Sequence, residues 1–174
     1  MREKQLKRLG SNVKRCRELR GWTQEELALS SGVSQSVIGS IEAPNVLTNQ
    51  KIGILLDLAD ALEMLPCALM DLTSEDVDNT YEEKIKVRTD IPREERREKQ
   101  IFVLGLNLQY YRKLRKYGKA TLKDLSGVCT TTISGIEAPK RYNNNTMGTI
   151  LDLANALDIP LHYLFDFTKG DLLL

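Results

Sequence analysis

Residues 23–42, TQEELALSSGVSQSVIGSIE, carry the clearest structural pattern in the chain. Thr23 is a favoured helix N-cap residue, and Glu26 three positions later completes the capping-box pattern. Gly32 accepts the left-handed backbone that a tight turn needs, and Ser34 is an N-cap residue for a further helix. The stretch therefore predicts two short helices joined by a glycine turn, with polar residues at the start of the second helix.

Apolar spacing on both sides of this stretch predicts three more helices. Apolar residues recur at intervals of three or four between positions 6 and 19, which predicts a helix. Gly21 is expected to end this helix. A fourth helix is expected to start at Thr48 or Asn49, and Pro66 is expected to open a short fifth one. The predicted apolar face of the fourth helix consists of Ile52, Leu55, Leu56, Ala59 and Leu62. The first 72 residues thus predict about five short helices around one core.

The length, net charge and composition of the chain exclude several classes of protein. The chain has 174 residues, enough for one domain or two small ones, and its formal net charge is only +1. It has no run of 18 apolar residues, and residues 1–10 lack the apolar core of a signal peptide. Three widely separated cysteines (Cys16, Cys67 and Cys129) are typical of a reducing compartment. We therefore expect a cytoplasmic protein that does not enter a membrane.

Enzymatic activity is not expected. His162 is the only histidine, and no cysteine or carboxylate lies near it at metal-ligand spacing. The sequence has no nucleophile–base set, no phosphate-binding loop and no paired carboxylates beyond those of helix surfaces. We expect no metal and no cofactor.

The chain contains an internal repeat. A constant offset of 95 aligns residues 2–72 with residues 97–167 without a gap, and 29 of these 71 pairs are identical. The repeated segments include REKQ, SGV, IEAP and LDLA. We interpret them as two copies of one fold, with a first domain at 1–72 and a second at 91–174.

Residues 73–90 lie between the copies and are rich in charge. We interpret them as a solvated linker, with a short strand within residues 80–89 as the alternative. Asp90 is a candidate cap and Pro92 a candidate first-turn residue for the helix that opens the second domain.

The first copy resembles the lambda-repressor-like, Cro-type family of helix-turn-helix DNA-binding domains. The segments RELRGWTQEELALSSGVSQSVIGSIE and LLDLADAL carry this resemblance over residues 9–72, and residues 104–167 carry it more loosely. The resemblance implies an all-α protein of two tandem five-helix helix-turn-helix domains joined by a charged linker. It also implies double-stranded DNA as the partner.

The resemblance assigns roles to polar residues of the first copy. The helix after the turn enters the major groove, so Gln35, Ser36 and Ser40 are expected to contact bases. Gln24, the first residue of the preceding helix, is expected to hold a phosphate. Further candidate phosphate contacts are Lys14, Arg15 and Arg20.

In the second copy several of these positions differ. Thr23-Gln24 becomes Gly118-Lys119, so the capping residue is lost and Lys119 is the candidate phosphate contact. Thr130 and Thr131 replace the first reading residues, and Cys129 replaces the cap Ser34. Lys140 and Arg141 in the following loop are expected to contact the DNA backbone. Tyr110, Tyr111 and Tyr117 are expected to join the core, with a partner surface as the alternative.

One pair of charged residues, present in both copies, suits a structural role. Arg17 and Glu42 recur as Arg112 and Glu137, and in related domains such a pair joins the first and third helices. Removing one partner of a half-buried ion pair costs about 3–5 kcal/mol.

These observations predict a sequence-specific transcriptional regulator, a repressor that acts by occluding its operator. Two reading heads in one chain are expected to span adjacent major grooves. The alternative is an interaction protein, resembling an antitoxin or an antirepressor-binding regulator, whose second domain binds a protein partner or forms a homodimer.

Overall fold

A computed structural model describes five ranges of the chain: 2–43, 49–66, 68–71, 91–138 and 144–165. Every regular element within these ranges is helical, as the sequence predicts. Contacts divide the chain into two compact units, residues 1–93 and 94–174. No helix in the described ranges is long and apolar enough to cross a membrane.

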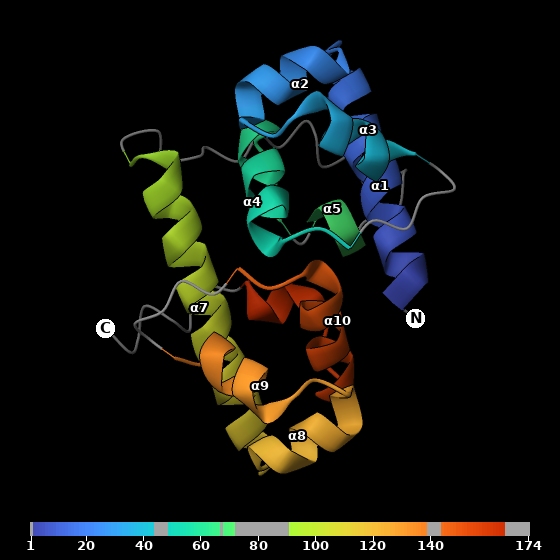
Figure 1. Ribbon diagram of the computed structural model, residues 1–174. Helices are drawn as coiled ribbons and strands as arrows, with labels where there is room; N and C mark the ends of the chain where they lie inside the picture. Colours follow the sequence, from blue (N-terminus) through green and yellow to red (C-terminus); the bar gives the residue numbers. More distant parts are fainter. Residues whose placement is uncertain (1, 44–48, 67, 72–90, 139–143, 166–174) are drawn as a thin grey trace. The chain divides into compact units, whose positions relative to one another are not determined.

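The first unit is drawn in blue to green in Figure 1. It contains α1 (Arg2–Leu19), α2 (Gln24–Ser31), α3 (Gln35–Glu42), α4 (Ile52–Ala61) and α5 (Ala68–Asp71). Apolar side chains from all five helices meet in one core, where their burial removes apolar surface from water. Side chains with less than 2% of their surface exposed include Val13, Cys16, Leu27, Ile38, Ile52, Leu56, Leu58 and Leu69.

The start of α2 and the turn after it are the predicted ones. The Thr23 hydroxyl accepts a hydrogen bond from the Glu26 amide at 3.1 Å, and the Glu26 carboxylate accepts one from the Thr23 amide at 2.6 Å. The carboxylate also accepts a hydrogen bond from the Thr23 hydroxyl at 2.9 Å. The bonds from the Thr23 amide and hydroxyl hold the pKa of the Glu26 carboxyl below its ordinary value, because both favour the charged form. Gly32 has a φ of 72°, and its N–H donates to the Ala28 carbonyl.

Close backbone packing sets the distance between α1 and α3. A β-carbon added at Gly10 would lie only 2.1 Å from the carbonyl oxygen of Ile41, so only glycine fits there. Two residues further along α1, the buried Asn12 side chain donates from Nδ2 to the Leu69 carbonyl oxygen of α5 at 3.1 Å. Helix α1 is thus held against α3 by backbone contact and against α5 by a hydrogen bond.

Three details of the helix boundaries differ from the sequence predictions. Helix α4 begins at Ile52 after the N-cap residue Lys51, which makes no side-chain cap bond, so the predicted start at Asn49 or one residue earlier is wrong. Ile52 is 1% exposed, which indicates that core packing sets this start. Helix α5 begins two residues after Pro66, and Ser34 occupies the N-cap position of α3 without a side-chain cap bond.

The second unit is drawn in yellow-green to red in Figure 1. It contains α7 (Arg93–Leu114), α8 (Lys119–Ser126), α9 (Thr130–Ile136), α10 (Met147–Ala156) and the 3₁₀ helix η1 (Leu161–Leu164). Helix α7 opens directly after Pro92, which therefore precedes the first turn. Asp90, the segment 73–90 and the final residues lie outside the described ranges.

Several contacts of the first unit recur 95 residues later. A β-carbon at Gly105 would lie 2.1 Å from the Ile136 carbonyl oxygen, and Asn107 Nδ2 donates to the Leu164 carbonyl at 3.2 Å. Gly127 has a φ of 72°, the same value as Gly32. Helices α8 and α10 begin and end 95 residues after α2 and α4. The repeated residues therefore make the same local contacts in the second unit.

Candidate nucleic-acid interface

Helix α3 presents polar side chains at its first turn. Gln35 and Ser36 are exposed. Within the described residues, no group forms a hydrogen bond with the side-chain amide of Gln35. Ser40 lies one turn later, is half-buried, and donates from Oγ to the Ser36 carbonyl oxygen at 2.9 Å. The apolar side of the same helix, Ile38 and Ile41, is buried. The helix is therefore anchored by one side and offers amide and hydroxyl groups on the other.

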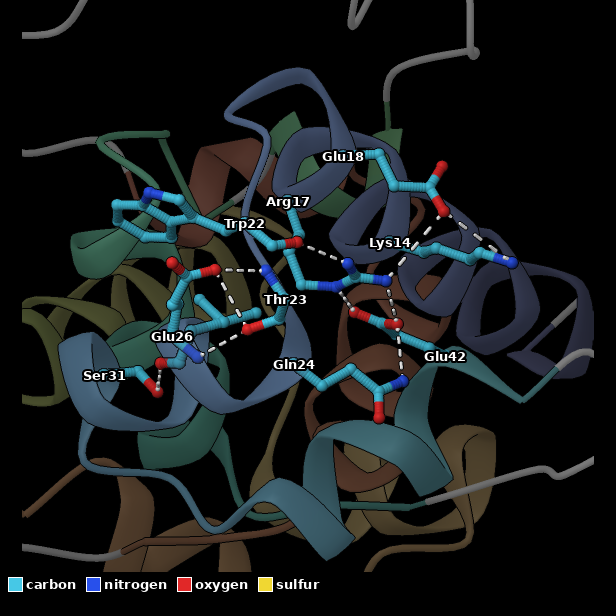
Figure 2. Close-up of polar contacts among 10 residues, drawn as sticks. Lys14, Arg17, Glu18, Trp22, Thr23, Gln24, Glu26, Ser31 and Glu42 are labelled. Atoms are coloured by element: carbon cyan, nitrogen blue, oxygen red, sulfur yellow. Dashed lines mark hydrogen bonds and ion pairs between the residues drawn. The ribbon is translucent and has the colours of Figure 1, made fainter.

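A buried carboxylate ties α3 to α1. Glu42 is 7% exposed and accepts two hydrogen bonds from Arg17, at 2.7 Å from Nε and 2.8 Å from Nη2. Arg17 Nη1 donates to the Trp22 carbonyl at 2.6 Å (Figure 2). The bonds to Glu42 raise the pKa of the Arg17 guanidinium above its ordinary value, against the opposing effect of burial. This bidentate pair fixes the end of α3 and the loop before α2 relative to α1.

Gln24 joins the same network. Its Nε2 donates to Glu42 Oε2 at 2.9 Å, so the amide is oriented by a buried group (Figure 2). An amide nitrogen carries two N–H donors, and one of them remains for another acceptor. The expected phosphate contact of Gln24 stays a prediction, and the network explains how the side chain is held at the first residue of α2.

The basic residues of α1 and of the turn that follows it have different environments. Arg20 is directed to the end of α4, where Nη2 donates to the Leu62 carbonyl at 2.7 Å and lies 3.3 Å from a Glu63 carboxylate oxygen. Its guanidinium also lies 5.1 Å from the Trp22 ring centroid, and only 12% of its side chain is exposed. Arg20 thus stabilises the packing of α1 on α4, and its phosphate contact stays a prediction.

Lys14 and Arg15 are exposed on α1. Lys14 Nζ lies 3.9 Å from a Glu18 carboxylate oxygen one turn later, a pair that solvent screens. Their phosphate contacts remain predictions.

The corresponding helix of the second unit, α9, has a different first turn. Thr131 is exposed and Thr130 half-buried, while the Cys129 thiol lies 3.1 Å from the Thr131 hydroxyl and 3.0 Å from the Thr132 hydroxyl. Lys119 donates from Nζ to the Ser134 hydroxyl at 3.0 Å. The side chains at this turn are therefore largely engaged with one another.

The ion pair at the far end of α9 repeats that of the first unit. Arg112 donates to the 3% exposed Glu137 at 2.6 and 2.8 Å and to the Tyr117 carbonyl at 2.9 Å. Lys119 Nζ lies 3.7 Å from Glu137, at the position that Gln24 occupies in the first unit. The predicted phosphate contacts Lys140 and Arg141 lie outside the described residues.

Cys129 is the reactive thiol among the described cysteines. Hydrogen bonds from Thr131 and Thr132 lower its pKa to about 7, and the side chain is exposed, whereas Cys16 is buried. Because the thiolate is the reacting form, we expect alkylation of Cys129 by iodoacetamide to rise with pH around a midpoint near 7. The measurement is the rate of modification at each pH, located by peptide mass spectrometry.

A Thr131→Val, Thr132→Val variant removes both hydroxyls at nearly constant volume. Its midpoint should move up toward the ordinary thiol value of 9.0. An unchanged midpoint would show that these hydroxyls do not set the thiol pKa.

The sequence interpretation missed two residues that hold the interface in place, Gly10 and Asn12. Both are identical in the second copy, as Gly105 and Asn107. Ser11 and Val13 beside them are replaced by Leu106 and Leu108, so the identity of these two positions across the repeat was the available signal.

Comparison with known proteins supports the assignment for the first unit. Residues 13–67 match the family model described as Helix-turn-helix, and this range contains α2, the glycine turn and α3. The match does not extend to the second unit. Comparisons with curated proteins and with solved structures give no match. The first unit therefore carries a helix-turn-helix domain, which is typical of DNA-binding transcription regulators.

Proposed function

We propose that the chain is a sequence-specific DNA-binding regulator that represses transcription by occluding its operator. The observation that carries this proposal is the exposed first turn of α3, with Gln35 and Ser36, on a helix whose other end is tied to α1 by the Glu42–Arg17 pair. A glutamine amide can pair bidentately with adenine in the major groove, and serine can donate or accept. The Ser40 hydroxyl donates its hydrogen to the Ser36 carbonyl oxygen of the same helix, so it would offer a base only a hydrogen-bond acceptor.

The second unit acts in this proposal as a divergent second helix-turn-helix domain. The support is the offset of 95 residues, which relates its ion pair, its turn glycine and its close glycine contact to those of the first unit. Thr130 and Thr131 would then face the second half-site. Half-sites on one side of the duplex lie about 34 Å apart. The 18 residues 73–90 can span at most about 60 Å, so the chain is long enough to reach both.

A second candidate function places DNA binding in the first unit and protein binding in the second. The engagement of Cys129 with its neighbouring threonines, and of Lys119 with Ser134 and Glu137, favours it. These contacts leave fewer groups of α9 for bases than α3 offers.

The test is a footprint of the full chain on DNA upstream of its own gene, repeated with Gln35→Ala. We expect the variant to lose about 1–3 kcal/mol of binding free energy at its best site and to discriminate less between sequences, because a base contact is removed. Gln100→Ala on α7 is the matched control and should bind like the parent chain, because neither Gln100 nor its equivalent Gln5 is a predicted DNA contact.

The same footprint separates the two candidate functions. If Thr130→Ala, Thr131→Ala shortens the protected region, both units read DNA. If that variant protects the same bases as the parent chain, the second candidate is favoured. Unchanged affinity and selectivity in Gln35→Ala would contradict the assignment of α3 as the reading helix.

A further inference from the structure

The second unit is more basic than the first where α7 ends and α8 follows. Residues 14–31 of the first unit carry four basic and three acidic side chains, whereas the equivalent residues 109–126 carry six basic and one acidic. The net charge of this segment is therefore +1 in the first unit and +5 in the second. Four lysines stand where the first unit has no basic residue: Lys113, Lys116, Lys119 and Lys123.

Much of this added charge has no acidic partner. Lys113, Lys116 and Lys123 are exposed, and within the described residues no carboxylate pairs with any of them. Lys113 Nζ donates to the neutral side-chain oxygen of Gln109 at 3.3 Å. The first unit differs, because three of its four basic side chains in the equivalent segment are ion-paired, namely Lys14, Arg17 and Arg20. The second unit thus presents an uncompensated positive surface, which attracts polyanions.

The backbone at Lys116 is a second, independent observation. Lys116 has a φ of 57°, in the left-handed region, and the equivalent Gly21 has a φ of 67°. Glycine adopts this conformation freely, whereas a residue with a β-carbon is disfavoured there. A lysine at this turn therefore strains the backbone where glycine would not, so packing of the unit does not account for it.

The start of α8 also favours an anion. In the first unit Thr23 caps α2, and the carboxylate of Glu26 lies at the same turn. The equivalent residues are Gly118, which makes no side-chain cap bond, and Thr121. The second unit therefore lacks the carboxylate at the positive end of this helix, and Lys119 adds a positive charge there.

We propose that Lys113, Lys116, Lys119 and Lys123 form a surface that binds the phosphates of duplex DNA without reading its sequence. Contacts to phosphates position a protein on the duplex and carry no sequence information directly. The second unit then supplies affinity, while α3 of the first unit supplies the choice of sequence. This role rests on the proposed function, because it takes duplex DNA as the partner of the chain.

Duplex DNA suits this surface better than an acidic protein does. The first unit carries a helix-turn-helix domain, and two modules of one chain that hold the same molecule strengthen each other, since the second contact becomes intramolecular. A duplex also carries one negative charge per about 1.7 Å of its axis whatever its sequence, so lysines find phosphates in any register.

The experiment is fluorescence anisotropy of a short labelled duplex of arbitrary sequence, titrated with the full chain at several salt concentrations. The variant Lys113→Gln, Lys116→Gly, Lys123→Ala removes the three exposed lysines. We expect the slope of log affinity against log salt to become shallower by about one for each lysine that contacts a phosphate. At about 0.1 M salt the affinity should fall roughly tenfold or more.

The control Lys4→Gln, Lys7→Gln, Lys99→Gln removes the same charge from exposed positions that are not predicted DNA contacts. This control should bind like the parent chain. The proposal is overturned if the lysine variant binds like the parent, or if the control weakens binding equally. Labelled polyglutamate is titrated in parallel, and binding as tight as that of the duplex would overturn DNA as the partner in favour of an acidic protein.

The single variant Lys116→Gly separates a role in binding from a role in folding. Because it relieves the left-handed backbone, it should unfold at the same or a higher urea concentration, followed by circular dichroism. Its salt slope should still become shallower by about one. A loss of stability with an unchanged slope would show that Lys116 is structural, and would overturn its place in the surface.

Comparison of two duplexes distinguishes failure of this proposal from failure of the proposed function. On the footprinted site and on the arbitrary duplex, the three-lysine variant should lose affinity by the same factor, whereas Gln35→Ala should lose mainly its preference for the site. If the parent chain prefers no site, the reading role of α3 fails, and the salt slope on the arbitrary duplex still decides the role of the lysines.

Discussion

Replacing Gly10 by alanine is expected to destabilise the first unit by about 3 kcal/mol or more. The new β-carbon would lie 2.1 Å from the Ile41 carbonyl oxygen, far inside van der Waals contact. Both groups belong to helix backbones, so no side-chain rotation relieves the clash, and α1 and α3 must separate. The higher helix propensity of alanine offsets only about 1 kcal/mol of this. The measurement is urea unfolding followed by the fluorescence of Trp22, the single tryptophan, which lies in the first unit.

Gly39→Ala is the matched control for this prediction. A β-carbon at Gly39, in α3, would have Gln24 Oε1 as its nearest neighbour at 3.5 Å, an ordinary contact. We expect this variant to unfold at the same or a higher urea concentration, with a gain of up to about 1 kcal/mol. If Gly10→Ala and Gly39→Ala unfolded alike, the close packing of α1 on α3 would be contradicted.

The clash also predicts an effect on the reading helix. Because α3 is held at its Ile41 end by Gly10 and at Glu42 by Arg17, a displacement of α1 moves the surface that carries Gln35. A residue far from the expected DNA contacts therefore determines where those contacts lie.

Signals that act over a few residues were readable from the sequence. Thr23 and Glu26 are three positions apart, and their reciprocal bonds depend only on the local backbone, so the predicted capping box is confirmed. Gly32 was predicted for the same kind of reason, since only the turn itself demands its positive φ. The predicted start of α4 was wrong because no cap bond determines where this helix begins. The burial of Ile52 in the core determines it instead.

Contacts between distant residues were readable only where the repeat revealed them. Arg17 and Glu42 are 25 residues apart, and their recurrence at Arg112 and Glu137 singled them out. Arg20 recurs as Arg115, yet its partner Leu62 offers a backbone carbonyl, which no sequence pattern marks. The sequence therefore predicts a phosphate contact for Arg20, and only the structure shows that this side chain also joins the end of α1 to the end of α4.

The first turn of α9 shows a different limit. The loss of a cap at Cys129 was predicted, but the sequence did not indicate that its thiol would contact Thr131 and Thr132. These contacts depend on side-chain rotamers at the start of one turn, which residue types alone do not determine.

Replacing Arg17 by methionine is expected to cost the first unit about 3–5 kcal/mol, because it leaves the charge of Glu42 buried without its main partner. Glu42 is 7% exposed and would keep only the bond from Gln24, while the Trp22 carbonyl would lose its donor. The measurement is urea unfolding followed by circular dichroism and Trp22 fluorescence. DNA affinity should fall as well, since Gln24 and the end of α3 are oriented by the same carboxylate.

The double variant Arg17→Met, Glu42→Leu separates the cost of an unpaired charge from the value of the pair. Replacing both partners of a buried ion pair by apolar residues of similar size is often neutral. We therefore expect the double variant to recover most of the stability that Arg17→Met loses, while its DNA binding stays weak because Gln24 no longer has a carboxylate to orient it. Recovery of stability without recovery of binding would show that the pair is kept for the position of the interface. A double variant as unstable as Arg17→Met would instead show that the guanidinium stabilises the unit mainly through its bond to the Trp22 carbonyl.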